Sequence, residues 1–295
     1  MTETMKTSKA TPTVNAAVRE LRHRLTPLYG RGEAEAVIRL IFQYLKGWST
    51  VDLIINENRV LSEYMQQKLQ EIENRLLNHE PIQYITEMAY FYGMDFHVAP
   101  GVLVPRPETE ELIDLIVKEN KGNDLRVLDA GTGSGCIAIA LSRNLPFSEV
   151  TAIDISPEAL EVARKNAADL HASSIRFLEE DIFNWRPEAD SFDIIVSNPP
   201  YVDESERADM EPNVLKYEPD IALFVPDSDP LRYYRRIGEV ALKALKPGGR
   251  LYFEINPRHA EEMTVLMKDL GFENIRLHAD IHCRQRFLSC CRSKE

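Results

Sequence analysis

The sequence predicts an α/β protein in which a small N-terminal helical domain precedes a seven-stranded, mainly parallel, doubly wound sheet. Short β-branched runs alternate with helical patterns after residue 108, and such alternation is typical of a parallel sheet with helices on both faces. Before residue 80, apolar residues recur only at helical spacing. A chain of 295 residues is long enough to hold both domains, each with a core.

The N-terminal segment shows two apolar stripes with the spacing of one helix face. The first consists of Val37, Leu40, Ile41, Tyr44 and Leu45, and the second of Leu61, Tyr64, Met65, Leu69, Ile72 and Leu76. Such stripes usually pack into a core, and we expect that here. Pro81 should end the second helix. The sequence therefore predicts a disordered tail at residues 1–10 and a helical domain at residues 11–80.

The remainder of the chain predicts a linker and then the sheet. Residues 81–107 alternate polar and apolar side chains and include Gly93 and Gly101, which favours a β-hairpin linker. The larger domain, residues 108–295, begins with a helix, and its strands are expected near residues 126–130, 150–154, 175–178, 192–197, 250–255, 275–279 and 286–291. The last two should pair as an antiparallel hairpin at one side of the sheet. A turn at residues 246–249 should precede the fifth strand.

A glycine-rich loop, Asp129-Ala130-Gly131-Thr132-Gly133-Ser134-Gly135, follows the first expected strand. Its glycines permit a tight turn and let backbone N–H groups approach a ligand closely. A dinucleotide fingerprint would need glycine at Cys136, so a nicotinamide or flavin site is disfavoured. Asp129 suits a cationic ligand better than a pyrophosphate, and its rival role is to fix the loop through backbone N–H groups. Asp154 ends the second strand, where a ribose-binding carboxylate belongs.

The tetrapeptide Asn198-Pro199-Pro200-Tyr201 ends the fourth expected strand. Prolines have no N–H to donate to a sheet, so the chain must leave the sheet at the strand's carboxyl end, where open α/β sheets bind ligands. The Asn198 side-chain oxygen and the Pro199 carbonyl are two acceptors that can hold an NH2 group, while the Tyr201 ring covers the planar group that carries it. Taken alone, the tetrapeptide is equally compatible with a turn that merely stops a strand.

These motifs together resemble those of S-adenosylmethionine-dependent methyltransferases that methylate a planar amino or amide nitrogen. A longer block, Phe91-Tyr92-Gly93 followed by GVLVPRPETE at residues 101–110, narrows the resemblance to the peptide chain release factor N5-glutamine methyltransferase family (HemK/PrmC type). Residues 80–85 and 217–219 match as well. The resemblance runs from about residue 80 to the C-terminus, and the N-terminal segment matches only in size and helical character.

The resemblance implies a Rossmann-like methyltransferase sheet, S-adenosyl-L-methionine as the methyl donor with S-adenosyl-L-homocysteine as product, and the glutamine of the Gly-Gly-Gln loop of release factors as the acceptor. The cofactor-binding residues that it implies are Asp129, Gly131, Thr132, Gly133, Ser134, Gly135, Asp154, Asp181, Ile182 and Asn198. Asp181 would accept from the adenine amino group, and Ile182 would pack on the ring. The catalytic residues that it implies are Asn198, Pro199 and Tyr201, joined on the substrate side by Pro200, Phe91 and Arg106. In the family, a small helical bundle helps to hold the protein substrate.

Other polar residues receive no role in the reaction. No general base is expected, because the sulfonium supplies an activated methyl group, and we interpret His97 and His259 as surface or packing residues. Asn256 stands where the family commonly has glycine after the acid of the fifth strand, Glu254. We interpret it as loop variation that does not touch the Asn198 constellation.

Charge distinguishes the two domains and bears on the partner. The chain carries a net charge of −12, with 35 Lys and Arg against 47 Asp and Glu. Residues 1–80 hold 11 basic and 10 acidic residues, a net of +1, which leaves −13 for the remainder. Nucleic-acid binding normally demands a basic face, so no stable nucleic-acid binding is expected. This disfavours the alternative, an adenine-N6 DNA or RNA methyltransferase with an Asn/Asp-Pro-Pro-Tyr motif, and favours a basic loop of a release factor as partner.

The sequence also bears on location and metals. It has no run of 18 or more apolar residues, and residues 1–9 lack an apolar signal core, so neither a membrane span nor secretion is expected. The four cysteines, Cys136, Cys283, Cys290 and Cys291, do not form a disulfide framework and indicate a reducing compartment, the cytoplasm. Without C-x-x-C or H-x-x-x-H spacing, no metal site is predicted.

Overall fold

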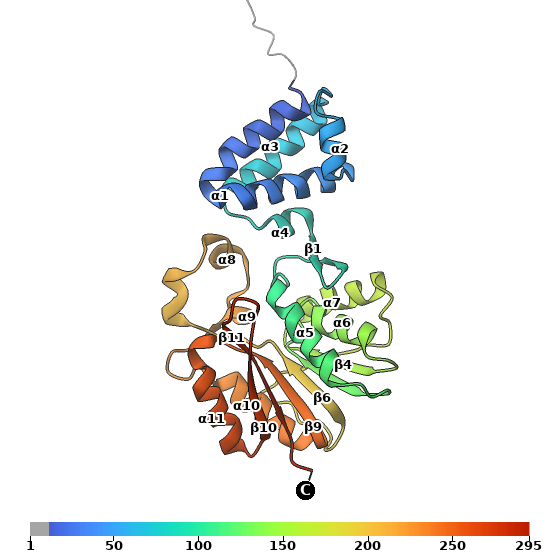
Figure 1. The fold of residues 1–295 in the computed structure, drawn as a ribbon, viewed down its shortest axis with the longest axis vertical. Helices are drawn as coiled ribbons and strands as arrows, with labels where there is room; N and C mark the ends of the chain where they lie inside the picture. Colours follow the sequence, from blue (N-terminus) through green and yellow to red (C-terminus); the bar gives the residue numbers. More distant parts are fainter. Residues whose placement is uncertain (1–11, 295) are drawn as a thin grey trace, which may run out of the picture. The chain divides into compact units, whose positions relative to one another are not determined.

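The computed structural model describes residues 12–294. The chain divides into two compact units whose boundary lies between Thr86 and Glu87 (Figure 1). One is helical and the other is a larger α/β unit, and each is described on its own. The expected tail at residues 1–10 lies outside the described residues.

The helical unit consists of α1 (Val14–Lys46), α2 (Thr50–Ile55), α3 (Glu63–Leu77) and α4 (Ile82–Thr86). The N-cap residues of the first three helices are Thr13, Ser49 and Ser62, whose hydroxyls accept hydrogen bonds from backbone N–H groups of the first turn. Gly30 breaks α1 with φ 74° and ψ 165°, a conformation that glycine adopts without steric cost.

Only some residues of the two predicted apolar stripes are buried in the core of the helical unit. The buried side chains in the second half of α1 are Ala34, Val37, Ile38, Ile41 and Phe42. Leu40 and Tyr44, in contrast, are 41% and 48% exposed, and Tyr64 on α3 is 64% exposed. The expectation that these three residues belong to the core is wrong. The packed face of α1 follows the row of Ile38 and Phe42 instead of the row of Leu40 and Tyr44.

A seven-stranded sheet forms the centre of the α/β unit, as predicted, in the order β10-β11-β9-β6-β3-β4-β5. The strands are β3 (Arg126–Ala130), β4 (Glu149–Asp154), β5 (Arg176–Glu179), β6 (Phe192–Ser197), β9 (Leu245–Glu254), β10 (Glu273–Ala279) and β11 (Gln285–Cys291). The five strands from β9 to β5 in this order are parallel, whereas β11 is antiparallel to both β9 and β10. The predicted hairpin at one side of the sheet is therefore confirmed.

The turn expected before the fifth strand lies inside β9. Leu245 already pairs with Phe192 of β6, and regular pairing resumes where Arg250 meets Ile194. Residues 246–249 form an irregularity between these two pairs, with Gly248 at φ 78°. The expected position is wrong because the sheet tolerates Pro247 and two glycines as a bulge between paired residues.

Side chains of the sheet alternate between two cores, one on each face. Ile194 and Val196 of β6 belong to the first core, while Ile195 between them belongs to the second. The first core includes α5 (Pro107–Glu119) and α6 (Cys136–Asn144), and the second includes α10 (Arg232–Ala244) and α11 (Ala260–Leu270). Helices thus cover both faces, which confirms the doubly wound arrangement (Figure 1).

Two smaller strand pairs complete the α/β unit. β1 (Met88–Phe91) and β2 (Met94–His97) form an antiparallel hairpin within the segment predicted as a linker. β7 (Val202–Asp203) and β8 (Phe224–Val225) form a short parallel pair. The segment between β7 and β8 carries η1 (Glu204–Asp209), α8 (Pro212–Tyr217) and α9 (Asp220–Leu223), and η2 (Pro257–His259) precedes α11.

Asn166 joins the hairpin to the glycine-rich loop. It lies on α7 (Pro157–Asp169) and is 1% exposed. Its Oδ1 accepts from the backbone N–H of His97 at 2.7 Å, and its Nδ2 donates to the carbonyls of His97 and Ser134, each at 2.9 Å. One buried amide therefore satisfies three backbone groups of two separate segments.

We expect Asn166→Ala to lower the free energy of unfolding by roughly 2–4 kcal/mol, because the three backbone groups lose their partner in a buried place. Chemical denaturation followed by circular dichroism measures the change. Asn184→Ala, which removes an exposed amide of the same unit, is the matched control and should cost less than about 1 kcal/mol. Equal losses in the two variants would contradict the assignment.

Candidate active site

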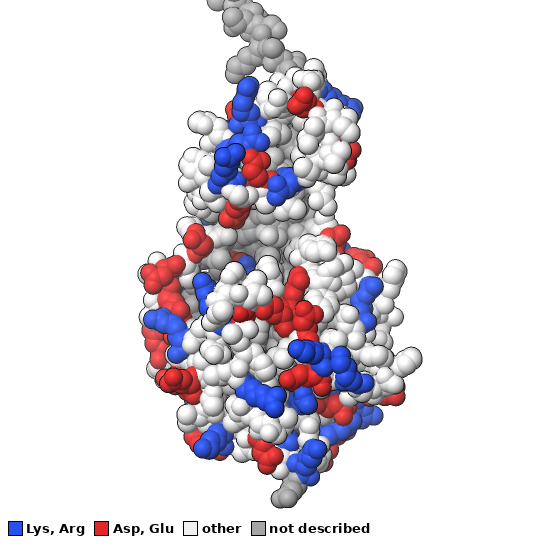
Figure 2. Space-filling model, viewed as in Figure 1, with Lys and Arg blue, Asp and Glu red and all other residues white. Residues whose placement is uncertain are grey.

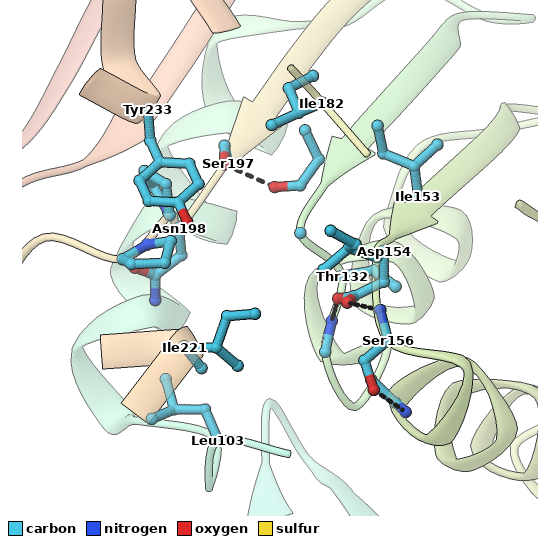
Figure 3. A pocket seen from close by; sticks show the side chains of 18 of the residues that line it. Leu103, Thr132, Ile153, Asp154, Ser156, Ile182, Ser197, Asn198, Ile221 and Tyr233 are labelled. Carbon is cyan, nitrogen blue, oxygen red and sulfur yellow. Dashed lines mark hydrogen bonds between the residues drawn. The ribbon is translucent and has the colours of Figure 1, made fainter. Parts of the chain in front are cut away.

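A cavity of about 350 Å³ lies at the carboxyl ends of β3, β4 and β6. The loop before α5, the glycine-rich loop, the ends of β4 and β5, the Asn-Pro-Pro segment, α9 and α10 all contribute to its wall. Asn198 and Tyr233 lie on one side of it, and Thr132, Asp154 and Ser156 lie on the opposite side (Figure 3). The cavity therefore brings together the two motifs that the sequence placed at strand ends.

The glycine-rich loop is held by the end of β4. The backbone N–H groups of Gly131 and Thr132 both donate to the carbonyl of Ile153, at 2.9 and 3.0 Å. The N–H of Gly133 donates to Asp154 Oδ2 at 2.8 Å. No atom lies within 4 Å of the place where a Cβ would stand at Gly131 or Gly133, so the space beside their backbone stays free for a ligand.

Gly135 has a different part in the loop. Its φ is 82°, and a Cβ there would come within 3.1 Å of Ala163 Cβ on α7. It begins α6 and does not line the cavity, unlike Gly131, Thr132, Gly133 and Ser134. Its lack of a side chain serves the close approach of α6 to α7.

Asp129 holds the loop from behind. It is fully buried and does not line the cavity. Its Oδ2 accepts from Thr132 Oγ1 at 2.6 Å and from the backbone N–H of Ala138 at 3.2 Å, and its Oδ1 has no partner among the described residues. Burial raises the pKa of Asp129 to about 7. Asp129 had two predicted roles, to face a cationic ligand and to hold the glycine-rich loop in place. This geometry favours the second role.

The buried Asp129 should make the stability of the ligand-free protein depend on pH. Because its pKa in the folded state is higher than in the unfolded chain, the stability that its protonated form gives at low pH is lost as pH rises through about 7. The free energy of unfolding of the wild type, relative to that of Asp129→Asn, should therefore fall between pH 5 and pH 8 by about 1 kcal/mol or more.

Chemical denaturation at several pH values measures this difference. Asp124→Asn, at an exposed position of the same unit, is the control for exchanging a carboxylate for an amide. A flat difference for Asp129→Asn would mean that its carboxyl group titrates alike in both states.

The ends of β4 and β5 bring three predicted cofactor residues to the cavity. Asp154 lines it while accepting from Gly133 and, through Oδ1, from the N–H of Ser156 at 3.0 Å. Burial raises the pKa of Asp154 above its usual range. Asp181 and Ile182 also line the cavity, and the Asp181 carboxylate accepts from the N–H of Phe183 at 2.9 Å. The cavity wall after β5 thus offers an acid and an apolar side chain.

The Asn-Pro-Pro segment lines the cavity, but the following tyrosine does not. Ser197 anchors the end of β6 by donating from Oγ to the carbonyl of Ala130 at 2.6 Å. The Tyr201 ring packs beside the second core, and its hydroxyl donates to Glu254 Oε1 at 3.0 Å. Burial raises the pKa of Tyr201 well above its usual range. The ring therefore does not lie over the cavity, where we expected it to cover the substrate.

The two substrate-side residues from the signature block have different positions. Phe91 is fully buried against Phe96 in the first core and does not line the cavity. Arg106 does line it and forms an ion pair with the buried Glu218 at 2.7 Å. Glu218 also accepts from the N–H of Val104 at 3.3 Å. This pair fastens the segment before α5 to the end of α8.

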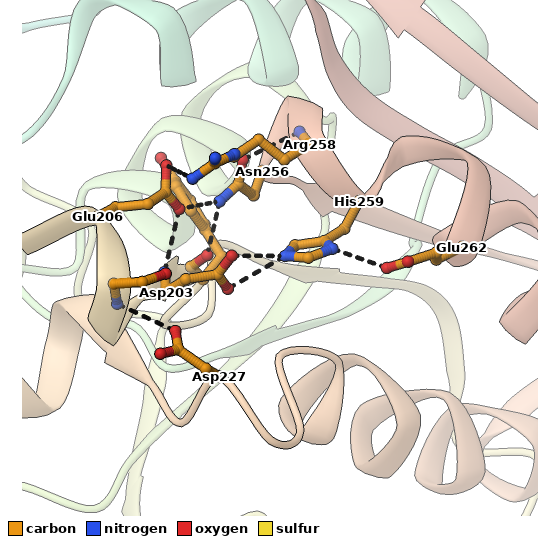
Figure 4. A network of polar contacts seen from close by, with 9 residues as sticks. Asp203, Glu206, Asp227, Asn256, Arg258, His259 and Glu262 are labelled. Atoms are coloured by element: carbon orange, nitrogen blue, oxygen red, sulfur yellow. Dashed lines mark hydrogen bonds and ion pairs between the residues drawn. The ribbon is translucent and has the colours of Figure 1, made fainter.

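A polar network supports the chain after Tyr201 (Figure 4). His259 Nε2 lies 2.9 Å from Asp203 Oδ2, and His259 Nδ1 lies 2.7 Å from Glu262. Burial lowers the pKa of His259, but its bonds to the two carboxylates outweigh burial and leave it raised. Asn256 donates to the carbonyl of Tyr201 at 3.1 Å and to Glu206 at 2.7 Å. The expectation that Asn256 stays away from the constellation is therefore wrong, because its amide donates to the backbone of Tyr201 and to Glu206 on η1.

Sequence reasoning missed several residues of the cavity wall. They are Leu103, Thr109, Ile153, Ser156, Ile221 and Tyr233. Thr109 stood inside the quoted signature block, and Ile153 and Ser156 flank Asp154, so their positions offered a signal. Ile221 and Tyr233 come from α9 and α10, far along the chain, and no local pattern marked them.

Comparisons with known proteins identify the family. Residues 121–281 match the family described as "Methyltransferase domain", and residues 16–86 match "PrmC N-terminal domain". A release factor glutamine methyltransferase of Bacteroides thetaiotaomicron is 47% identical over 95% of this chain and 100% of that protein. One of Flavobacterium psychrophilum is 41% identical over 90% of this chain and 94% of that protein. The chain belongs to the release factor glutamine methyltransferase family.

A solved structure agrees with the fold. A methyltransferase from Pyrococcus furiosus aligns with 76% of this chain and 99% of its own, with a TM-score of 0.51 at 19% identity. Family and fold make the protein an S-adenosylmethionine-dependent methyltransferase. The cavity fits that cofactor, because it combines backbone without side chains at Gly131 and Gly133 with the Asp154 carboxylate and the apolar Ile182.

Within residues 12–294, no helix is long and apolar enough to cross a membrane.

Proposed function

We propose that the protein transfers a methyl group from S-adenosylmethionine to the side-chain amide nitrogen of the glutamine in the Gly-Gly-Gln loop of peptide chain release factors. The observation that carries the proposal is that Asn198 and Pro199 line the cavity, with Asn198 across from Thr132 of the glycine-rich loop (Figure 3). Curated relatives that are 47% and 41% identical carry the name release factor glutamine methyltransferase, which supports this substrate.

Methyl transfer to an amide depends more on the orientation of the substrate nitrogen than on a general base. An amide nitrogen is a poor nucleophile, because its lone pair is delocalised into the carbonyl. Asn198 Oδ1 and the Pro199 carbonyl would accept from its two N–H groups and aim the nitrogen at the methyl group. These bonds strengthen as positive charge develops on the nitrogen, so they favour the transition state over the bound substrate. The product nitrogen then releases its extra proton to water.

No histidine occurs among the described residues that line the cavity. His97 and His259, the two considered from the sequence, bond elsewhere: His97 Nδ1 lies 3.1 Å from the carbonyl of Glu87, and His259 bonds to Asp203 and Glu262. Their positions agree with a reaction that uses no dedicated base.

For the cofactor, we propose that the loop from Gly131 to Gly135 approaches its amino-acid end and that Asp154 accepts from the ribose hydroxyls. Asp181 would accept from the adenine amino group and Ile182 would pack on the ring. The sulfonium of the bound cofactor supplies an activated methyl group. Asn198, on the opposite side of the cavity, would contact both cofactor and substrate.

We further propose that residues 11–80 help to hold the release factor, that residues 81–107 act as a linker and that residues 108–295 carry out catalysis. The acidic side chains along η1 and α8, among them Glu204, Asp209 and Glu211, would suit a basic loop of the partner (Figure 2). The same acidity disfavours stable binding of nucleic acid. Because release factors act in translation and the four cysteines are free thiols, which is typical of a reducing compartment, we place the reaction in the cytoplasm.

The proposed substrate is tested by incubating the protein with labelled S-adenosylmethionine and a bacterial release factor. We expect one added methyl group, located by mass spectrometry on the glutamine of the Gly-Gly-Gln loop. A release factor with glutamine replaced by alanine should accept none. DNA and RNA, offered at low and high salt, should remain unlabelled. Methylation of adenine without transfer to glutamine would favour the adenine-N6 methyltransferase alternative.

Asn198→Ala should slow methyl transfer by about 10²–10³-fold, the loss typical of removing one positioned hydrogen-bonding group from an active site. Binding of S-adenosylmethionine, measured by calorimetry, should survive, because most of the cofactor's proposed contacts come from other residues. Asn144→Ala, at the end of α6 and outside the cavity wall, is the control for a lost asparagine amide. Near-normal turnover by folded Asn198→Ala would remove Asn198 from the mechanism.

A further inference from the structure

We propose that Thr109, held by the buried carboxylate of Glu254, orients the Asn198 amide so that its oxygen faces the cavity. Thr109 would then be a positioning residue, and Glu254 would act through it. The inference deepens the proposed function and rests on it, since the Asn198 oxygen matters only if it receives a substrate N–H. None of the sequence motifs assigned Thr109 or Glu254 a role.

Glu254 is an ionisable group in a buried place. It ends β9 and is 1% exposed. Its Oε2 accepts from Thr109 Oγ1 at 2.7 Å, and its Oε1 accepts from the Tyr201 hydroxyl at 3.0 Å. Burial raises the pKa of Glu254, while the two hydroxyls and the nearby Arg286 guanidinium oppose this rise. One donor on each oxygen is the arrangement that stabilises the ionised carboxylate.

The bond to Glu254 decides what Thr109 can offer to Asn198. A hydroxyl has one hydrogen, and that of Thr109 is used in the bond to the carboxylate. Thr109 Oγ1 can therefore only accept from its other neighbour. Asn198 Nδ2 lies 3.5 Å from Thr109 Oγ1, a long contact in which the NH2 group of the amide faces the hydroxyl. In the flipped orientation, Asn198 Oδ1 would face Thr109 Oγ1, and neither oxygen would have a hydrogen to donate. The network therefore favours the orientation with Nδ2 toward Thr109.

The selected orientation is the one that the reaction needs. With Nδ2 toward Thr109, Oδ1 is left to accept from the substrate amide in the cavity, which both Asn198 and Thr109 line. A flipped Asn198 would present its NH2 group to the NH2 group of the substrate, donor against donor. Glu254 also accepts from the Tyr201 hydroxyl, so one buried carboxylate bonds directly to the last residue of the Asn-Pro-Pro-Tyr segment and is linked to the first through Thr109.

The test compares variants that keep or remove the hydroxyl of Thr109. Thr109→Val has nearly the same shape and should lower kcat about tenfold, the scale of one hydrogen bond. The Kd for S-adenosylmethionine should not change. Thr109→Ser keeps the hydroxyl and should restore kcat to within about threefold of the wild type. Thr264→Val, which removes a hydroxyl bonded to the backbone of α11, is the matched control and should leave kcat unchanged. Equal kcat in Thr109→Val and the wild type would overturn the inference.

A double-mutant cycle separates positioning from general support of the fold. If Thr109 acts through Asn198, adding Thr109→Val to Asn198→Ala should slow transfer no further. If Thr109 only supports the fold, the two losses should multiply, and that result would overturn the inference. Glu254→Gln, which carries no charge and leaves one acceptor oxygen for the hydroxyls of Thr109 and Tyr201, should also lower kcat about tenfold or more.

A second measurement does not depend on the substrate. The side-chain NH2 signals of Asn198, identified in a ¹⁵N spectrum by their loss in Asn198→Ala, should shift in Thr109→Val and in Glu254→Gln but not in Thr264→Val. Unshifted signals would overturn the inference even if glutamine is methylated. A wild type that methylates no glutamine, with the signals shifted as expected, would instead refute the proposed function and leave the oriented amide established.

Discussion

The site depends on the two prolines that end β6. Neither Pro199 nor Pro200 has an N–H group that could donate to a neighbouring strand. The central strand β6 must therefore end at Ser197, and the chain leaves the sheet there. The Ser197 hydroxyl fastens this exit to the carbonyl of Ala130 on the neighbouring strand, just before the glycine-rich loop. The two halves of the cavity therefore begin at adjacent points of one rigid sheet, and their spacing is set by the strand pairing of β3 and β6.

Buried or half-buried carboxylates hold the loops that leave these strands. Asp129 fixes the glycine-rich loop from behind, Asp154 fixes it from β4, and Glu254 fixes Thr109 and Tyr201. Each accepts from backbone N–H or hydroxyl groups, which offsets the cost of burying a charge. The groups left for the reaction are an amide oxygen and a backbone carbonyl. Both are neutral acceptors, suited to a substrate nitrogen that must gain positive charge only at the transition state.

Local patterns in the sequence were sufficient for much of the fold and for the cavity residues next to the motifs. The seven strands and the positions of Gly131, Asp154 and Asn198 at strand ends can be predicted from short segments, because only neighbouring residues in the sequence determine them. The direction of the Tyr201 ring could not be predicted, because it depends on Glu254, which lies 53 residues further along the chain. The exposure of Leu40 and Tyr44 was missed for a related reason. Helical spacing shows which apolar residues share a face of the helix, but the neighbouring helices determine which side of that face is buried.

The mechanism requires that the Asn198 oxygen and the Pro199 carbonyl accept from the two N–H groups of the substrate amide. The most direct measurement is a crystal structure with S-adenosylhomocysteine and a release factor or its Gly-Gly-Gln peptide. The glutamine nitrogen should lie about 2.9 Å from both Asn198 Oδ1 and the Pro199 carbonyl oxygen. That nitrogen should also be directed at the sulfur of the cofactor product. A glutamine whose oxygen instead faces Asn198, or whose nitrogen contacts neither acceptor, would contradict this mechanism.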